Sequence, residues 1–173
     1  MKVHRQIRAF SLLEVIIAVG LFVSSAVVII GFIAALSRQG ADSADTLAAQ
    51  KLPEPLRVEL ARLAGSDLEA LAAQIPVMSA PLTDGLAFAA TREVTGVESL
   101  AYLPPANDRI PAAEQYYLVE CWKFQDEPLR FDAQKAFLAL QVRVSWPYRL
   151  PGVADPTEPS ARSQITFTMS LTR

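Results

Sequence analysis

Residues 15–37 read VIIAVGLFVSSAVVIIGFIAALS, a run of 23 residues without a charged side chain. About 20 apolar residues are enough to cross the ~30 Å hydrocarbon layer of a membrane, so this run can span it with a small tilt. An ordinary secretory signal peptide has a shorter apolar core, of about 7–15 residues, before its cleavage site. The run therefore predicts a membrane-spanning helix.

The flanking charges predict how this helix is oriented. Lys2, Arg5 and Arg8 precede the run, whereas only Arg38 follows it closely. Basic residues favour the cytoplasmic side of a membrane. We therefore expect a single-pass membrane protein with a cytoplasmic N-terminus and with residues 40–173 in an extracytoplasmic space.

The rest of the chain has the composition of an acidic, folded domain. Of its 173 residues 51% are hydrophobic, which excludes disorder of the whole chain. Sixteen Lys and Arg against eighteen Asp and Glu give a net charge of −2. Loss of Lys2, Arg5 and Arg8 would leave thirteen against eighteen, a net charge of −5. Such a surface matches a phosphate backbone poorly, so no nucleic acid is expected as a partner.

Glu14 stands at the entrance of the apolar run. A carboxylate in lipid costs ~2.5–3.5 kcal/mol near the centre of a helix, and less near the interface, unless a partner offsets the charge. The spacing alone leaves two interpretations open. Glu14 is either a glutamate resting at the headgroup boundary, or a functional group that requires a partner.

Residues 8–18 read RAFSLLEVIIA, and this segment resembles the processing motif of type IV prepilins and type II secretion pseudopilins. That motif is a short basic leader and a small residue, then Phe, Thr or Ser, Leu, an aliphatic residue and Glu, opening a long apolar helix. The resemblance implies that residues 1–9 are a leader peptide, that a prepilin peptidase cuts between Ala9 and Phe10, and that the new Phe10 amine is methylated. The chain has Ala9 where this family usually has glycine, and Gly31 where it often has a proline within the helix.

Cleavage would place a new amine at Phe10, one helical turn before Glu14. At this separation of four residues, the amine and the carboxylate can pair within one chain or between neighbouring chains. The resemblance favours the second arrangement, in which Glu14 meets the Phe10 amine of an adjacent subunit as the helices pack. A misplaced helix would leave both charges unpaired in an apolar bundle, so the pairing would set the register. The resemblance thus assigns Phe10 and Glu14 to assembly, with other pilin or pseudopilin subunits as partners. It also implies that the helix lies in the inner membrane and that the C-terminal domain is periplasmic.

The domain organisation follows from the span and from the prolines behind it. We expect the transmembrane and assembly helix over residues 10–37, a periplasmic continuation of this helix over 38–52, and an extracytoplasmic α+β domain over 53–173. Pro53 and Pro55 end the long helix, because proline lacks the N–H donor and clashes with the preceding turn.

Two short helices are predicted behind these prolines. Leucines spaced by four and three residues predict an amphipathic helix that ends at Gly65. Ser66 and Glu69 have the spacing of a capping box, with the serine as the cap, so a further helix is expected from there to about Ile75.

Four segments alternate between apolar and polar residues in the manner of half-buried strands. In 115–125, Leu118, Trp122 and Phe124 share one side, with Glu120 as the exception. Four strands with one wet face predict an antiparallel sheet whose dry face packs on the helix. The fold class is therefore α+β, a long N-terminal transmembrane helix followed by short helices and an antiparallel sheet of about four strands, an order similar to that of pilins. The segments are 86–95, 115–125, 137–146 and 164–173.

Catalytic and metal-binding patterns are lacking in the sequence. His4 is the single histidine and lies in the expected leader, which leaves no histidine for acid–base chemistry or metal ligation. Cys121 has no second cysteine and is interpreted as a buried, small apolar residue beside Trp122. Acidic pairs such as Asp42 and Asp45 are interpreted as solvated surface. We expect no enzyme, no catalytic residue, no metal and no cofactor.

Two functions are consistent with these observations. The first is a minor pilin or pseudopilin, a structural subunit of a type IV pilus or a type II secretion-like filament. The second is an uncleaved, single-pass membrane protein that displays an extracytoplasmic binding domain. The two differ in the mature N-terminus, because only the first begins at a methylated Phe10.

Overall fold

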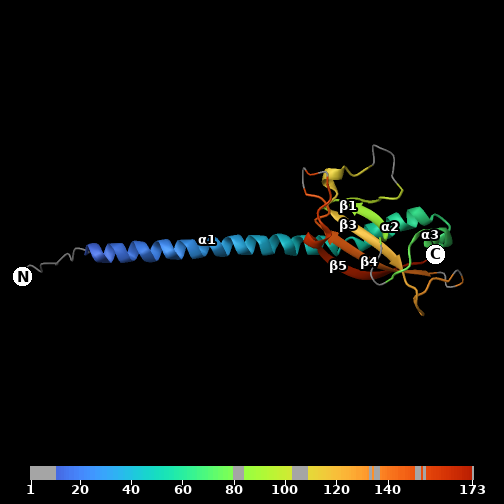
Figure 1. The fold of residues 1–173 in the computed structure, drawn as a ribbon, viewed down its shortest axis with the longest axis horizontal. Coiled ribbons are helices and arrows are strands. Elements are labelled where there is room, and N and C mark those ends of the chain that lie inside the picture. The colour runs from blue at the N-terminus through green and yellow to red at the C-terminus, as the bar shows by residue number, and fades with distance from the viewer. Residues whose placement is uncertain are drawn as a thin grey trace, which may run out of the picture. The chain divides into compact units, whose positions relative to one another are not determined.

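The computed structural model describes residues 11–79, 84–102, 109–132, 134, 137–150, 153 and 155–172. The chain forms two compact units, Met1–Ala44 and Asp45–Arg173, of which the second is the globular unit. Its helices are α1 (Leu12–Ala49), α2 (Pro53–Ala64) and α3 (Leu68–Gln74), with short 3₁₀ turns η2 (Ala112–Glu114) and η4 (Pro159–Ala161) (Figure 1). Its strands are β1 (Leu86–Ala90), β2 (Val97–Ser99), β3 (Tyr117–Lys123), β4 (Phe137–Trp146) and β5 (Ser163–Thr172).

Helix α1 contains the whole apolar run, as the sequence predicts (Figure 1). It ends at Ala49, slightly before the expected end at Leu52. The N–H of Leu52 donates to the carbonyl of Ala49 at 3.2 Å, a tight bond over three residues that closes the helix in a turn. Pro53 is then the first residue of α2, where its fixed φ angle fits and no N–H is needed.

Both predicted short helices are present, but the cap of α3 is Asp67 and not Ser66. The Asp67 Oδ1 atom accepts hydrogen bonds from the backbone N–H groups of Glu69 and Ala70, each at 3.0 Å. Asp67 has the extended backbone of an N-cap residue, whereas Ser66 still lies in the turn that ends α2. The capping-box spacing was therefore correct about the helix and wrong by one residue about the cap.

The sheet is antiparallel throughout and has the strand order β2-β1-β3-β4-β5. Among the described residues five strands form where the sequence predicts four, because β2 has only three residues and is too short to show an alternating pattern. The strand expected over 86–95 ends at Ala90, because the chain turns after it and returns as β2. Strand β4 has the predicted bounds, and β5 begins one residue earlier than predicted.

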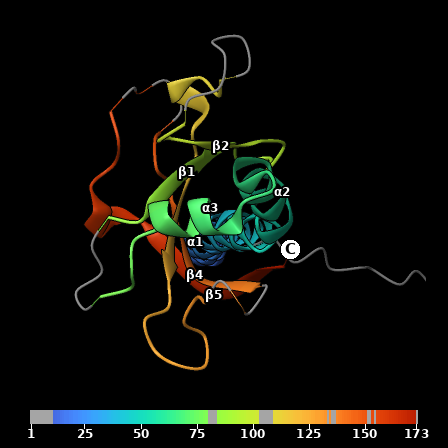
Figure 2. The ribbon, with the colours of Figure 1, turned by 90° about the vertical axis from the view of Figure 1, so that its right-hand side faces the viewer.

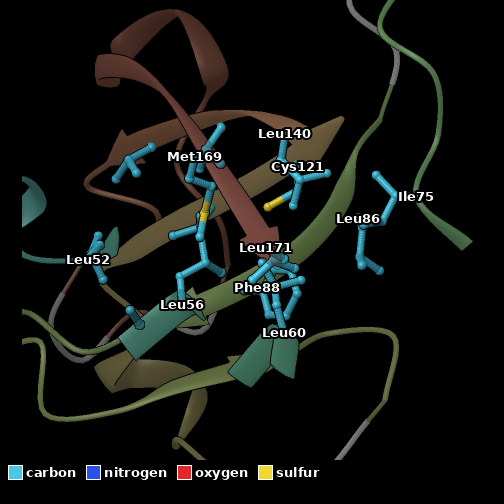
Figure 3. Close-up of a cluster of buried hydrophobic side chains, with 14 of the residues drawn as sticks. Leu52, Leu56, Leu60, Ile75, Leu86, Phe88, Cys121, Leu140, Met169 and Leu171 are labelled. Atoms are coloured by element: carbon cyan, nitrogen blue, oxygen red, sulfur yellow. The ribbon is translucent and has the colours of Figure 1, made fainter. Parts of the chain in front are cut away.

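One face of the sheet packs on the helices of the globular unit. Phe88, Val119, Val144 and Ile165 lie opposite one another on four successive strands. Helices α2 and α3 pack on this face (Figure 2), and Leu52, Leu56 and Leu60 supply its helical side (Figure 3). The predicted apolar faces of β4 and β5 are the ones that belong to this core.

The predicted face of β3 is wrong. Tyr117, Val119 and Cys121 face the helices and are fully buried, whereas Trp122 is buried on the opposite face of the sheet. Strand β3 is central in the sheet, and both of its faces are covered. Alternation therefore does not identify its core face, because apolar residues occur on both sides.

Candidate functional site

The apolar side chains of α1 are exposed along the entire run. Leu12, Phe22 and Val28 have 80%, 75% and 70% of their surface exposed, and none of the most apolar window of the helix is buried within the protein. A helix that is apolar on all sides is suited to a membrane or to the interior of a bundle. Among the described residues, this is the one helix long and apolar enough to cross a membrane.

The polar side chains in this run are satisfied within the helix itself. The hydroxyls of Ser24 and Ser25 donate to the carbonyl of Leu21 at 3.0 and 2.8 Å, and that of Ser37 donates to Ile33 at 2.9 Å. These bonds remove the penalty of an unsatisfied hydroxyl in lipid or in an apolar bundle. The serines are therefore compatible with an apolar environment on every side of the helix.

Glu14 lies in the first turn of α1 and is exposed. Its backbone N–H donates to the hydroxyl oxygen of Ser11 at 3.2 Å and to the Ser11 carbonyl at 3.0 Å, so Ser11 caps the helix. Within the described residues, no cation lies within ion-pair distance of the Glu14 carboxylate. The predicted processing residues Ala9 and Phe10 lie outside the described residues, so the structure does not report the pairing of Phe10 with Glu14.

A polar cluster in the globular unit is centred on Asp45. The two carboxylate oxygens of Asp45 accept from the Arg92 guanidinium at 2.9 and 3.0 Å, and one also accepts from the Tyr116 hydroxyl at 2.6 Å. The Tyr117 hydroxyl donates to the backbone carbonyl of Asp45 at 2.9 Å. The cluster thus joins the last turns of α1 to the start of β3 and to the turn after β1.

Burial changes the acidity of both tyrosines in this cluster. Desolvation, followed by the effect of the Asp45 carboxylate, raises the pKa of Tyr117 to about 12. The pKa of Tyr116 is also raised, first by desolvation and then by its hydrogen bond to Asp45. Both phenols are therefore neutral donors at physiological pH, which suits a structural role rather than proton transfer.

The Asp45 cluster corrects the interpretation of Asp45 as solvated surface. Only 7% of Asp45 is exposed, and its carboxylate has three donors. Its partners lie 47 and 71 residues further along the chain. No local pattern connects positions so far apart, so the sequence offered no signal for this cluster.

A second ion pair lies on the sheet face that is turned away from the helices. The Arg143 guanidinium donates to the Glu120 carboxylate at 2.8 Å and lies 5.0 Å from the ring centre of Trp122.

Cys121, which follows Glu120 in β3, is fully buried, and desolvation raises the pKa of its thiol. This confirms that Cys121 is a buried side chain, and its raised pKa leaves little thiolate for reaction.

Several hollows lie on the surface of the globular unit in the part of the chain that the structure describes. One of about 350 Å³ is lined by Arg92, Glu93, Tyr116 and Arg149 among others, and two of these residues, Arg92 and Tyr116, belong to the Asp45 cluster. In the part of the chain that the structure describes, no three His, Cys, Asp or Glu side chains are grouped as metal ligands would be. The feature that points most directly to a function is therefore the exposed apolar helix with Glu14 in its first turn.

Comparison with known proteins adds no further assignment. No protein-family model, curated protein or solved structure matches this chain.

Proposed function

We propose that this chain is a minor pilin or pseudopilin, a subunit of a type IV pilus or of a type II secretion-like filament. The observation that supports it is the position of Glu14, in the first turn of a helix whose apolar surface is exposed throughout. The residues around it, from Arg8 to Ala18, resemble the prepilin processing motif, with Ala9 in place of the usual glycine. The α+β layout, with a long helix followed by an antiparallel sheet, is compatible with a pilin-like fold.

In this proposal, the helix has two successive environments. The precursor spans the inner membrane, and the prepilin peptidase removes the leader between Ala9 and Phe10. The exposed apolar side chains then pack against the same helix of neighbouring subunits. Ser24, Ser25 and Ser37 enter this bundle without cost, because their hydroxyls already donate to the helix backbone.

Glu14 supplies specificity to this assembly. Its carboxylate pairs with the new Phe10 amine of a neighbour, so that both charges are compensated only when the helices are in register. A charge-assisted pair of this kind contributes ~1.5–3 kcal/mol where water is excluded, which corresponds to a tenfold or larger change in assembly.

Co-purification of partner pilins tests this role. Glu14→Val and Glu14→Gln should insert into the membrane normally but recover far fewer partner subunits than the native chain does. Glu14→Gln keeps the size of the side chain and removes only its charge. Glu69→Val is the matched control, because Glu69 is an exposed glutamate in the first turn of α3, outside the proposed assembly helix.

The mass of the mature chain separates this proposal from an uncleaved anchor. A subunit begins at a methylated Phe10, whereas an anchored binding module retains residues 1–9. Equal recovery of partners with native Glu14 and with Glu14→Gln, together with a retained leader, would favour the anchored module.

A further inference from the structure

Strand β5 is a long, uncharged edge of the sheet. It is the last strand in the order β2-β1-β3-β4-β5 and pairs only with β4 (Figure 2). Its ten residues read SQITFTMSLT, without a charge, a proline or a glycine. No hydrogen bond joins the backbone of this strand to a residue outside β4 in the part of the chain that the structure describes.

Such an exposed edge strand is unusual in a monomeric protein. Edge strands are normally short, charged or interrupted by proline or a bulge, because their free N–H and C=O groups otherwise pair with another chain. The opposite edge of this sheet follows that rule. Strand β2 has three residues, and its Glu98 carboxylate accepts the backbone N–H of Ile110 at 2.7 Å.

The apolar side of β5 is also incompletely covered. Val142 and Val144 on β4 are fully buried, but their partners on β5, Phe167 and Ile165, are only partly buried against the core. A strand added beside β5 would cover these two side chains and pair the free backbone groups.

We propose that β5 pairs antiparallel with β5 of a second copy of this chain, which joins two five-stranded sheets into one sheet of ten. On the free edge of β5, the N–H and C=O groups of every second residue point away from β4. A two-fold pairing of β5 with its own copy therefore places side chains that lie on the same face of the sheet opposite each other. Apolar side chains of one copy then meet apolar side chains of the other. An uncharged strand meets its own copy without like-charge repulsion.

The β5 pairing joins two copies and cannot extend to a third. The contact is isologous and uses the β5 edge of both chains, which leaves only the short β2 edges outside. The pairing is centred on Thr168 and covers Gln164–Thr172. This register keeps the second strand away from the loop before β5, where Arg162 is tied to the carbonyl of Thr157.

Cysteine cross-linking of the full chain in its membrane tests the pairing. Thr168→Cys should give a disulfide-linked dimer under mild oxidation, because residues opposite each other have Cβ atoms about 4.5–5.5 Å apart. Thr166→Cys alone should give none, because it lies opposite Ser170. A cross-link only between chains carrying Thr166→Cys and chains carrying Thr168→Cys would support the same pairing, with its centre at Phe167. Thr95→Cys, exposed in the turn after β1, is the control, and the native Cys121 is buried and gives no background.

A charge at the same position gives a second, independent readout. Thr168→Lys should abolish the dimer of the full chain in detergent, because two lysines would face each other across the axis, whereas Thr95→Lys should not. The Thr168→Cys cross-link should persist in a Glu14→Gln chain, which separates this pairing from helix assembly. The proposal would be overturned if neither the Thr168→Cys cross-link nor the cross-link between Thr166→Cys and Thr168→Cys chains formed, or if the cross-link joined a different protein. An unchanged Thr168→Lys dimer, or loss of the cross-link in Glu14→Gln, would overturn it as well.

Discussion

The hydroxyl of Tyr117 donates a hydrogen bond of 2.9 Å to the backbone carbonyl oxygen of Asp45, 72 residues earlier in the chain. The side chain of the same Asp45 accepts from Arg92 and from Tyr116. Asp45, near the end of α1, is therefore hydrogen-bonded to Arg92 in the turn after β1 and to Tyr116 and Tyr117 at the start of β3. These hydrogen bonds fix the end of the helix within the globular unit, together with the burial of Ala49 in its core.

Asp45→Ala should lower the free energy of unfolding of the globular unit by about 2–3 kcal/mol, because it leaves the Arg92 guanidinium and the Tyr116 hydroxyl without their acceptor. Arg92→Ala should lower the free energy of unfolding by about 1 kcal/mol or less, because 54% of the Arg92 side chain is exposed and water can replace its hydrogen bonds to Asp45. Urea unfolding of the full chain in detergent measures both. Equal losses in the two variants would contradict a central role for Asp45.

Val144→Asp tests the core face of β4. Val144 is fully buried between Val119 and Ile165, so the new carboxylate would have no partner and no water. We expect a loss of about 3 kcal/mol or more, enough to unfold a marginally stable domain. Thr166→Asp is the control, because it adds the same charge to an exposed position of β5. A thermal melt in which both variants match the native chain would show that the strand register is wrong.

The sequence predicted most of the fold from local patterns. Strict alternation identified β4 and the apolar face of β5, because both strands have a dry side and a wetter side. The same rule failed for β3, where Cys121 and Trp122 are both buried but on opposite faces. It also missed β2, whose three residues are held by pairing with β1 rather than by a pattern of their own.

The candidate functional residues could likewise be predicted from the sequence only in part. Glu14 stands out in the sequence because a lone carboxylate beside 23 uncharged residues conflicts with its surroundings, and its role in assembly stays a prediction from the resemblance to prepilins. The role of Asp45 could not, because its partners Arg92 and Tyr116 become neighbours only after the sheet has formed. Contacts over such separations depend on topology, which no local pattern of residues encodes.

The buried phenols and the buried thiol should make the free energy of unfolding fall in alkaline solution. An unfolded tyrosine loses its proton near pH 10, whereas folded Tyr117 holds its proton up to about pH 12. Between these values the unfolded chain binds fewer protons, so the free energy of unfolding decreases by about 1.4 kcal/mol per pH unit for each such tyrosine. The pKa of Tyr116 is raised as well, so it adds to this slope.

Urea unfolding at about pH 8, 10 and 11 measures this slope. Tyr117→Phe should be less stable than the native chain at the lowest pH, because its bond to Asp45 is lost, and should show a shallower decline above pH 10. Cys121→Ala should delay the onset of the decline, because an unfolded thiol begins to lose its proton near pH 8.5. A native chain with constant stability over this range would contradict the buried state of these groups.

Gly85→Ala should destabilise the globular unit because Gly85 lies against the backbone of β3. A Cβ atom at this position would be 2.9 Å from the Cys121 carbonyl oxygen and 2.9 Å from Cε2 of Trp122. Neither atom can move freely, since one belongs to a paired strand and the other to a fully buried ring. We expect a loss of about 1–3 kcal/mol, with a change in tryptophan fluorescence as the Trp122 ring shifts.

Gly96→Ala is the matched control for this steric effect. A Cβ atom there meets only Cδ1 of Ile110 at 3.8 Å, an ordinary van der Waals contact. Its stability should therefore stay the same or rise by a few tenths of a kcal/mol up to about 1 kcal/mol, because alanine restricts the unfolded chain more than glycine does. Thermal melts of the two variants beside the native chain make the comparison. If both substitutions lowered the melting temperature equally, chain flexibility rather than the close approach to Cys121 and Trp122 would explain the glycine at position 85.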